Sequence, residues 1–551
     1  MRRLLWPIAA CVAGLLAIPV ASSSSLGAAT STWQSIASAP GNPGAMFLMT
    51  NGQVLVSDQG STNSGSPRWW LLTPSSSGSY VDGTWSNAAS LPGGYSPVYF
   101  ASGVLPDGKL IIEGGEFNGT STWAGTNLGA IYDPVANTWT SVTPPDNGQG
   151  CWANIADAPS VVLADGTFLL GDSGSRTTKC QALFNEATMS WTTTGAGKAD
   201  PNPEEGFTLL PNGTVLDVNS GTAPYALGGT QNTELYDPST GSWTSAGNTP
   251  QALDDSEAEI GPAALMPSGV VFAEGATGAT ALFDTATKTW AAGPTMPTVS
   301  GAQLTATDSC SAILPDGNVL FNASPNQQPP TAWFTFDGTS ITPVLNDVAM
   351  SATREQSNYC NALVLPTGQV LVNDRNGPNS MEVYNQGGVP KSQWLPQVTA
   401  MPSAITAGST YTMTGTQFSG LDQGSYFGDD LTNATNYPLL QITNLSTNQV
   451  VYARTLGFSS MSIAPGAVSS SNFVVPLSTD DGPANARVIV NGIASAAQSV
   501  TISGGVNLPT PTTTTTPKPQ PKTTRILCVR GHVKRSVVGV HPRCPKGFTK
   551  K

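Results

Sequence analysis

Between residues 30 and 396 the chain repeats one hydrophobic pattern, in which an apolar run, a short turn that ends in glycine and a second apolar run follow one another. Two examples are SGVLPDGKLIIEGG and SAILPDGNVLF. Apolar and polar residues alternate within these runs, and Asp-Gly or Asn-Gly turns typically join two antiparallel strands. We therefore expect a β-hairpin at each of the seven turn glycines, which are Gly52, Gly108, Gly166, Gly213, Gly269, Gly317 and Gly368.

A second repeated signal alternates with the hairpins. It consists of an aromatic residue, a polar turn and a tryptophan, and it occurs as YDPVANTW, FNEATMSW, YDPSTGSW and FDTATKTW. The tryptophans of these segments are 52, 52 and 47 residues apart, and we expect them to pack in the core. A repeat of this length with several short strands in each unit is typical of propeller blades, so the seven turn glycines predict seven blades.

The chain start carries one further strand signal, STWQSIASAP, which contains Trp33 and has no hairpin before it. We expect this strand to complete the last blade and to close the ring. A simple lead-in to the first blade is the alternative. Almost every apolar run of the chain is strand-like, so the predicted fold class is all-β.

The repeat stops after residue 396. Residues 397–503 contain alternating strands such as STYTMTG and ARVIVNG, which predict one immunoglobulin-like β-sandwich. The Pro- and Thr-rich stretch 504–524 is typical of an extended, disordered linker. Residues 525–551 form a basic tail with two cysteines, which is too short to build a core of its own.

Residues 1–29 have the pattern of a secretory signal peptide. Arg2 and Arg3 precede an apolar stretch from residue 4 to residue 20, and small residues follow. No later stretch approaches the ~20 apolar residues that a membrane-spanning helix needs. The sequence therefore predicts a secreted, extracellular protein without a membrane span.

Charge is divided sharply along the chain. Residues 30–517 hold all 35 acidic residues and 11 basic ones, whereas residues 518–551 hold ten Lys or Arg and no acid. The acidic body would repel phosphates, so we expect no nucleic-acid partner. The basic tail could attach the protein to an anionic cell-wall polymer. A solvated tail that only improves solubility, or one that folds onto its own acidic body, is the alternative.

Six cysteines remain once the signal peptide is set aside, and an even number in an exported chain favours disulfides. Three local pairs are the simplest partition: Cys151–Cys180, Cys310–Cys360 and Cys528–Cys544. The pair Cys310–Cys360 needs a bulge or a bend, because the two residues differ by one in their distance from the turn glycine that follows.

The order Gly114-Gly115, Tyr132, Trp139 resembles a kelch blade. A secreted kelch ring followed by an immunoglobulin-like domain resembles galactose oxidase and related copper-radical oxidases, and the resemblance covers roughly residues 30–503. In that family a Tyr-His pair before one inner strand and a second His from the following domain hold copper. Another tyrosine, cross-linked to a cysteine, carries the radical.

The copper ligands of that family are missing here. In SNYCNALVLPTG, Tyr359 stands in the place of the tyrosine, but Cys360 stands where the histidine would be. The two histidines of the chain, His532 and His541, both lie in the tail. Because copper(II) prefers nitrogen and oxygen ligands, we expect neither copper nor alcohol oxidation, and no other cofactor is predicted. A thioether between Cys310 and Tyr359 is the alternative to the Cys310–Cys360 disulfide.

Residues eight to ten positions before a turn glycine should lie where an inner strand begins, at the mouth of the central channel. These positions hold Tyr99, Asp157, Glu205, Glu259, Asp308 and Tyr359, and Trp152 and Arg354 are nearby in the sequence. Such a mouth would be concave and negatively charged. Its carboxylates could hold calcium, or could bind sugar hydroxyls while Tyr99, Trp152 and Tyr359 offer flat apolar faces.

Two further interpretations of the mouth stay open. Paired carboxylates can act as acid and base on a glycan. Alternatively, the acids only cap backbone donors or face channel water. A Ser-His-Asp triad is excluded, because the body has no histidine. We expect non-catalytic binding of an extracellular carbohydrate or surface component, and the alternative is a galactose-oxidase-like or glycan-acting enzyme that uses the acidic mouth.

Overall fold

The computed structural model describes residues 32–60, 64–146, 150–174, 178–203, 205–222, 226–227, 229–256, 259–344, 356–373, 380–427, 434–506 and 524–551. The expected signal peptide at 1–29, Arg354 and nearly all of the linker 504–524 lie outside these residues. The chain forms two compact units, Met1–Gly505 and Val506–Lys551, and each is described by itself.

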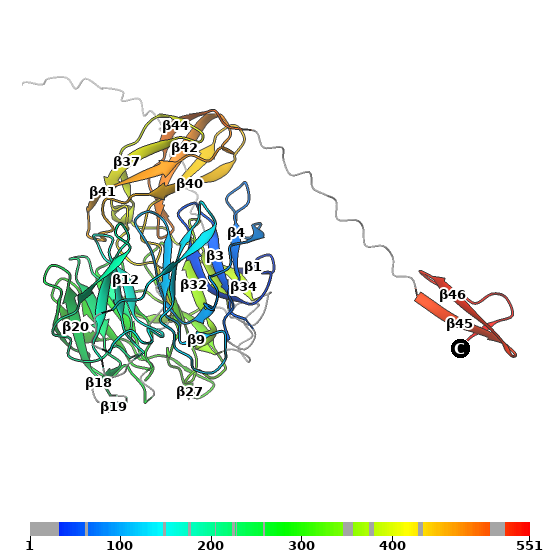
Figure 1. Cartoon of the computed structure of the whole chain (residues 1–551), viewed down its shortest axis with the longest axis horizontal. Helices are drawn as coiled ribbons and strands as arrows, with labels where there is room; N and C mark the ends of the chain where they lie inside the picture. Colours follow the sequence, from blue (N-terminus) through cyan, green and yellow to red (C-terminus); the bar gives the residue numbers. More distant parts are fainter. Residues whose placement is uncertain are drawn as a thin grey trace, which may run out of the picture. The chain divides into compact units, whose positions relative to one another are not determined.

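Seven antiparallel sheets, built on four strands each, follow one another along the described part of residues 32–385 (Figure 1). Sheet 1 consists of β2 (Pro43–Leu48), β3 (Val54–Asp58), β4 (Trp69–Thr73) and β5 (Thr84–Asn87). Sheet 2 consists of β7 (Ala101–Val104), β8 (Leu110–Glu113), β10 (Gly129–Asp133) and β11 (Thr138–Val142). Sheet 3 consists of β12 (Ser160–Val162), β13 (Phe168–Gly171), β14 (Gln181–Asn185) and β15 (Ser190–Thr194).

The remaining sheets repeat the same order. Sheet 4 consists of β16 (Phe207–Leu209), β17 (Val215–Val218), β20 (Asn232–Asp237) and β21 (Ser242–Asn248). Sheet 5 consists of β22 (Ala263–Leu265), β23 (Val270–Glu274), β24 (Thr280–Asp284) and β25 (Thr289–Ala292). Sheet 6 consists of β28 (Cys310–Ile313), β29 (Val319–Ala323), β30 (Ala332–Phe336) and β31 (Ile341–Pro343). Sheet 7 consists of β32 (Asn361–Val364), β33 (Val370–Asn373), β34 (Met381–Asn385) and β1 (Thr32–Ser35).

The predicted hairpins are confirmed. Each turn glycine joins the first two strands of a sheet, and all seven have φ between +78° and +88°. At Gly108, which bonds back to the Leu105 carbonyl at 2.9 Å, a side chain would also meet the carbonyl oxygen of Thr455 at 2.9 Å. Glycine is favoured at such positions because it adopts positive φ at little steric cost.

The aromatic–turn–tryptophan segments form the outer hairpin of a sheet. Tyr132 in β10 lies opposite Trp139 in β11, with ring centroids 5.1 Å apart, and Phe184 and Trp191 repeat the pair in sheet 3 at 5.0 Å. The indole nitrogen of Trp139 donates to the carbonyl of Ala89, beyond the last strand of sheet 1, at 3.0 Å. The tryptophans therefore stabilise their own sheet and also join it to the preceding one.

The sheets form a propeller-like ring, because the first strand of one sheet contacts the first strand of the next. Such contacts join β7, β12, β16, β22, β28, β32 and β2 in that order. The ring closes where β1 pairs with β34, with Trp33 opposite Tyr384. This confirms the predicted closure by the strand at the chain start.

The described residues also form short elements between the sheets. These are the strand pairs β6 (Pro97–Val98) with β9 (Phe117–Asn118), β18 (Gly221–Thr222) with β19 (Ala226–Leu227), and β26 (Thr298–Val299) with β27 (Ala302–Gln303). Two 3-10 turns are η1 (Ser357–Tyr359) and η2 (Ser392–Trp394). No helix among the described residues has the length and apolar character to span a membrane.

The chain after the ring folds around a core of its own, which includes Met413, Phe473 and Val488. Its strands hydrogen-bond in one continuous order, β35-β37-β41-β40-β39-β42-β44-β36, with β43 beside β42. They are β35 (Gln397–Ala400), β36 (Ala404–Thr406), β37 (Thr410–Thr416), β39 (Leu439–Asn444), β40 (Val450–Leu456), β41 (Val468–Val474), β42 (Gly482–Val490), β43 (Ile493–Ala494) and β44 (Gln498–Ser503).

This second part covers the end of the ring that carries the hairpin turns. The amide of Gly457 donates to the carbonyl of Pro106 at 2.6 Å, and that of Met461 donates to Ala164 at 2.9 Å. From it, residues 418–427 enter the ring, where β38 (Ser425–Phe427) pairs with β28 and places Cys310 opposite Phe427. The opposite end of the ring, where the first strands of the sheets begin, is called the mouth face below.

All three predicted disulfides are present: Cys151–Cys180, Cys310–Cys360 and Cys528–Cys544. Cys310 begins β28, whereas Cys360 ends the turn η1 just before β32, so this turn supplies the predicted bend. The second unit is a three-stranded antiparallel sheet of β45 (Thr524–Arg530), β46 (Val533–Gly539) and β47 (Thr549–Lys550), and it contains Cys528–Cys544.

Candidate ligand-binding site at the mouth face

The backbone at the mouth face contains several left-handed residues other than glycine. Tyr99 (φ +53°), Trp152 (φ +69°), Ala156 (φ +58°) and Asp308 (φ +44°) all lie in the segments that lead into the first strands of sheets 2, 3 and 6. This conformation is unfavourable for residues with a side chain, and it is maintained only where surrounding contacts fix it. Such residues gather at binding sites more often than elsewhere.

Backbone hydrogen bonds join two loops of this face, 114–128 from sheet 2 and 150–157 from sheet 3, which together are called the rim. The amide of Gly115 donates to the carbonyl of Ala156 at 2.7 Å, and that of Ile155 donates to Thr126 at 2.9 Å. The side-chain amide of Asn127 donates to the carbonyl of Trp152 at 3.0 Å. These hydrogen bonds hold the two loops of the rim against each other.

Trp123 is the more exposed of two large apolar side chains that the rim presents to solvent, with 60% of its surface exposed against 39% for Leu128. Its indole lies over Gly125, where a β-carbon would come within 3.1 Å of the ring and 3.4 Å of Ala156. Sequence reasoning missed Trp123, because it belongs to no repeated segment. The signal was available: it is a lone tryptophan in a loop of Ser, Thr and Gly, outside any strand pattern.

The residues predicted to lie at the mouth differ in their burial and in their hydrogen-bond partners. Asp157 is 8% exposed and accepts a hydrogen bond from the Ser173 hydroxyl at 3.1 Å. Asp308 is half-buried and accepts from the Gln327 side chain at 2.8 Å. Glu259 is also half-buried. The tyrosines at 99 and 359 are half-buried as well, and the Tyr99 ring lies 6.0 Å from Phe117.

Trp152 does not offer the flat face that the sequence predicted, because only 3% of its surface is exposed. The residue packs within the hydrophobic core that includes Ile155. Its left-handed backbone is compatible with this inward placement. The exposed aromatic side chain of the rim is therefore Trp123, which precedes Trp152 by 29 residues, whereas Trp152 helps to support the rim from within.

Glu205 is not at the open mouth either. Its side chain is fully buried, 3.1 Å from the ammonium nitrogen of Lys198, which also bonds Asp217 and lies 3.2 Å from Glu234. Burial opposes the charge of Lys198, but these three carboxylates outweigh it and raise the pKa of the lysine. Sequence reasoning could not place this group, because the four residues come from three separate segments of sheet 4.

The carboxyl groups around Lys198 are affected in the opposite sense. Burial and the neighbouring Asp217 raise the pKa of Glu205 well above its ordinary value. Burial also raises the pKa of Asp217 to about 6, although Lys198 acts against it. Glu205 is already paired with the ammonium group of Lys198, so its carboxyl group is not available for the calcium site that the sequence allowed.

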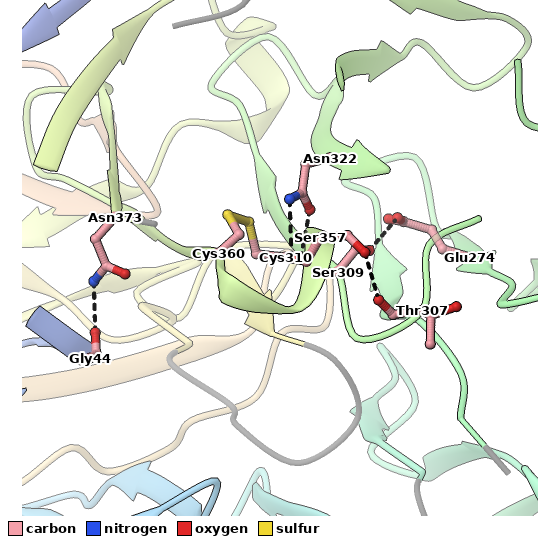
Figure 2. The surroundings of a disulfide bond; sticks show 9 residues. All are labelled: Gly44, Glu274, Thr307, Ser309, Cys310, Asn322, Ser357, Cys360 and Asn373. Carbon is pink, nitrogen blue, oxygen red and sulfur yellow. Dashed lines mark hydrogen bonds between the residues drawn. A yellow bond between two sulfur atoms is a disulfide. The ribbon is translucent and has the colours of Figure 1, made fainter. Parts of the chain in front are cut away.

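Other buried polar side chains join neighbouring sheets by hydrogen bonds. The Asn373 side chain at the end of β33 donates to the carbonyl of Gly44 in β2 at 2.7 Å (Figure 2). The Asn322 side chain in β29 donates to Ser357 at 3.2 Å, and the Ser309 hydroxyl donates to Glu274 in β23 at 3.4 Å. These bonds connect sheets 5, 6, 7 and 1.

The residues present do not fit a copper centre. Cys310 and Cys360 are bonded to each other, so neither sulfur is a free thiolate or a partner for a thioether with Tyr359 (Figure 2). The ring and the part after it contain no histidine. Among the described residues, one group of possible ligands gathers, Cys151, Asp172 and Cys180, and its two sulfurs are joined in a disulfide. Disulfide sulfur lacks the thiolate charge that metals require.

Comparisons with known proteins locate the chain only broadly. No protein-family model matches the sequence, and no curated protein matches it. A fungal alcohol oxidase of the AA5 family, solved in complex with copper, has 15% sequence identity and a TM-score of 0.49 over 86% of this chain and 100% of its own. The extracellular domain of a putative one-component system from B. thetaiotaomicron has 12% identity and a TM-score of 0.43 over 77% of this chain and 51% of its own.

Proposed function

We propose that the protein is an exported binding protein, in which a seven-bladed kelch-type propeller is followed by an immunoglobulin-like domain and a basic tail. Its mouth face would bind an extracellular carbohydrate or surface component without chemical conversion. Three disulfides support export, because such bonds persist in oxidising compartments. The lack of histidine in the body argues against the enzymatic alternatives that use an imidazole ligand or base.

The observation that carries this proposal is the exposed indole of Trp123 on a rim fixed by hydrogen bonds. An indole presents a rigid apolar face together with one N–H donor, which suits the apolar face of a sugar ring that carries hydroxyls on its edge. The hydroxyls of Thr120 and Thr122, 3.0 Å apart and exposed, lie on the same loop. A fixed loop loses little conformational entropy when it binds.

The basic tail supplies a second proposal, attachment to an anionic polymer of the cell envelope. The second unit has no acidic residue, and its strands carry Arg525, Arg530, Lys534 and Arg535. Leu527 and Val538 on these strands remain exposed. A basic surface of this kind attracts polyanions, and the attraction weakens as salt screens it.

One array experiment tests both proposals. Full-length protein, Trp123→Ala and a chain ending at Gly505 are applied to immobilised neutral glycans and to immobilised polyglycerol phosphate. Loss of the indole should weaken glycan binding by roughly tenfold or more, which is ~1.4 kcal/mol. Loss of the tail should abolish only the polyglycerol phosphate signal, which should also fall with salt.

The matched control is Val135→Ala, since Val135 is 67% exposed but lies in the outer turn of the same sheet, away from the rim. Trp123→Phe keeps a flat ring and should retain part of the binding. Equal glycan signals for wild type and Trp123→Ala would rule out the rim as the glycan-binding site. Equal polyglycerol phosphate signals with and without the tail would rule out the tail as the site of attachment.

A further inference from the structure

Sheet 4 encloses an amine and a carboxyl group in a water-excluded setting that differs from an ordinary surface ion pair. Lys198 lies in the segment before β16, and its ammonium group contacts Asp217 of β17 directly. Neither side chain has any exposed surface. We propose that Lys198 and Asp217 condense to an intramolecular amide (isopeptide) bond, with Glu205 as the group that transfers the protons.

The neighbours of Lys198 favour this reaction over a simple salt bridge. The Trp243 ring lies 4.9 Å from the ammonium nitrogen, and the Phe207 ring packs 5.4 Å from Trp243. Aromatic surface on one side and buried carboxylates on the other keep water away from the amine. The three carboxylates favour the charged amine at rest, so the reaction has to begin with transfer of one of its protons to a neighbouring carboxylate. The neutral nitrogen can then act as a nucleophile.

Glu205 is placed to carry the protons. One of its oxygens lies 3.1 Å from the Lys198 nitrogen, and the same nitrogen bonds Asp217, so the two carboxyl groups meet at one amine. Because burial raises the pKa of Glu205, its carboxylate is a stronger base than usual. It can accept a proton from the amine and, once protonated, donate that proton to the departing oxygen of Asp217. General acid–base transfer of this kind requires a group beside the reacting atoms, and Glu205 contacts the nitrogen that attacks Asp217.

The step balances without any further reagent. Lys198 passes one proton to Glu205, and its neutral nitrogen attacks the side-chain carbonyl carbon of Asp217. The new C–N bond forms as one C–O bond of the carboxyl group breaks. The departing oxygen takes a second amine proton and the proton held by Glu205, and leaves as one water molecule. No atom is oxidised or reduced, and Glu205 ends as it began.

Asp217 is the expected partner rather than Glu234. Glu234 accepts a hydrogen bond from the Ala199 amide at 2.8 Å, and another from Asn219 at 3.4 Å, so backbone and side-chain donors hold it in place. Among the described residues, the second oxygen of Asp217 forms no hydrogen bond with a fixed donor. Asp217 is therefore less committed to other contacts than Glu234.

Mass spectrometry of the full-length protein tests the proposal directly. Digestion after glutamate cuts the unfolded chain at Glu204 and Glu205, between the two residues. The fragments containing Lys198 and Asp217 should stay joined, with a mass that is lower by one water than their sum. Separate fragments of full linear mass in the wild type would overturn the proposal. A water loss confined to the Lys198 fragment would overturn Asp217 as the partner.

Three variants separate the roles. Lys198→Arg should give unlinked fragments. Asp217→Asn should still link, but with loss of ammonia instead of water, so that the joined fragment has the same mass as in the wild type. Glu205→Gln should remain unlinked, and a linked product would overturn the role of Glu205. Only monomeric material with wild-type tryptophan fluorescence is digested, so that unfolding does not imitate loss of the bond.

Discussion

At the scale of single residues, the buried acids of this protein fall into groups with different neighbours. Glu274 accepts a bond from a neighbouring sheet, and Glu205 and Asp217 surround a lysine. Asp422 lies fully buried at the base of the segment that enters the ring, where the Asn491 side chain donates to it at 2.7 Å. Burial raises the pKa of Asp422 to about 7, although hydrogen bonds from Gly424 and Asn491 act against the shift.

The Asp422 shift predicts a pH dependence of stability. The carboxyl group of Asp422 binds its proton more tightly in the folded state than in the unfolded chain. Its ionisation therefore lowers the free energy of unfolding as pH rises from about 4 to about 7. Above pH 7 it causes no further change with pH. Asp422→Asn keeps the accepting oxygen but cannot ionise. The free energy of unfolding of the variant should therefore exceed that of the wild type by an amount that grows across this range and reaches a few kcal/mol at pH 8.

Urea unfolding at several pH values measures this difference. Asp337→Asn is the matched control, because Asp337 is an exposed turn carboxylate that accepts bonds from the amides of Thr339 and Ser340 at 2.8 Å. The control should show no comparable gain with pH. If Asp422→Asn raises the free energy of unfolding by the same amount at pH 4 and at pH 8, Asp422 is not the source of the pH dependence.

At the scale of elements, the ring depends on contacts between sheets that are distant in the sequence. The indole nitrogens of Trp85 and Trp191 donate to the carbonyls of Ala37 and Thr143 in the preceding sheet, at 2.9 and 2.8 Å. Trp33 packs against Tyr384 of its own sheet at 4.8 Å and against Trp333 of sheet 6 at 5.1 Å. β1 is held in sheet 7 by such contacts, since no hairpin turn joins it to β34.

Trp33→Ala should therefore destabilise the ring more than the matched change Trp191→Ala. Trp191 packs against Phe184 and Phe168 of its own sheet, and its strand continues from a hairpin turn. We expect Trp33→Ala to lower the free energy of unfolding by about 2 kcal/mol or more, and to speed amide exchange across β1. An equal or smaller loss than for Trp191→Ala would contradict closure by β1.

The elements could be predicted from the sequence because the repeated signals are local. A turn glycine needs positive φ, and an aromatic–turn–tryptophan segment forms its own hairpin, so Gly108 and Trp139 reveal their structure without distant partners. Lys198, Glu205 and Asp217 meet only once sheet 4 has formed. Trp123 belongs to no repeated segment, so the repeats do not reveal its place. The burial of Trp152 depends on how the loops of two sheets pack.

At the scale of the whole molecule, charge and chemistry are separated along the chain. The body between residues 30 and 517 is strongly acidic and holds no histidine, whereas the tail carries both histidines and ten basic residues. Within the first unit, the part after the ring covers the hairpin end, opposite the mouth face. This separation underlies our proposal that the mouth face binds the ligand and that the tail attaches the protein to the envelope.

Amide hydrogen exchange of the full-length protein, with and without the glycan that gives the strongest array signal, tests the central claim most directly. The account predicts slower exchange in the rim, residues 114–128 and 150–157, and none of this slowing in Trp123→Ala. Protection confined to the domain at 397–503 or to the tail would contradict binding at the mouth face, as would an array on which no glycan binds.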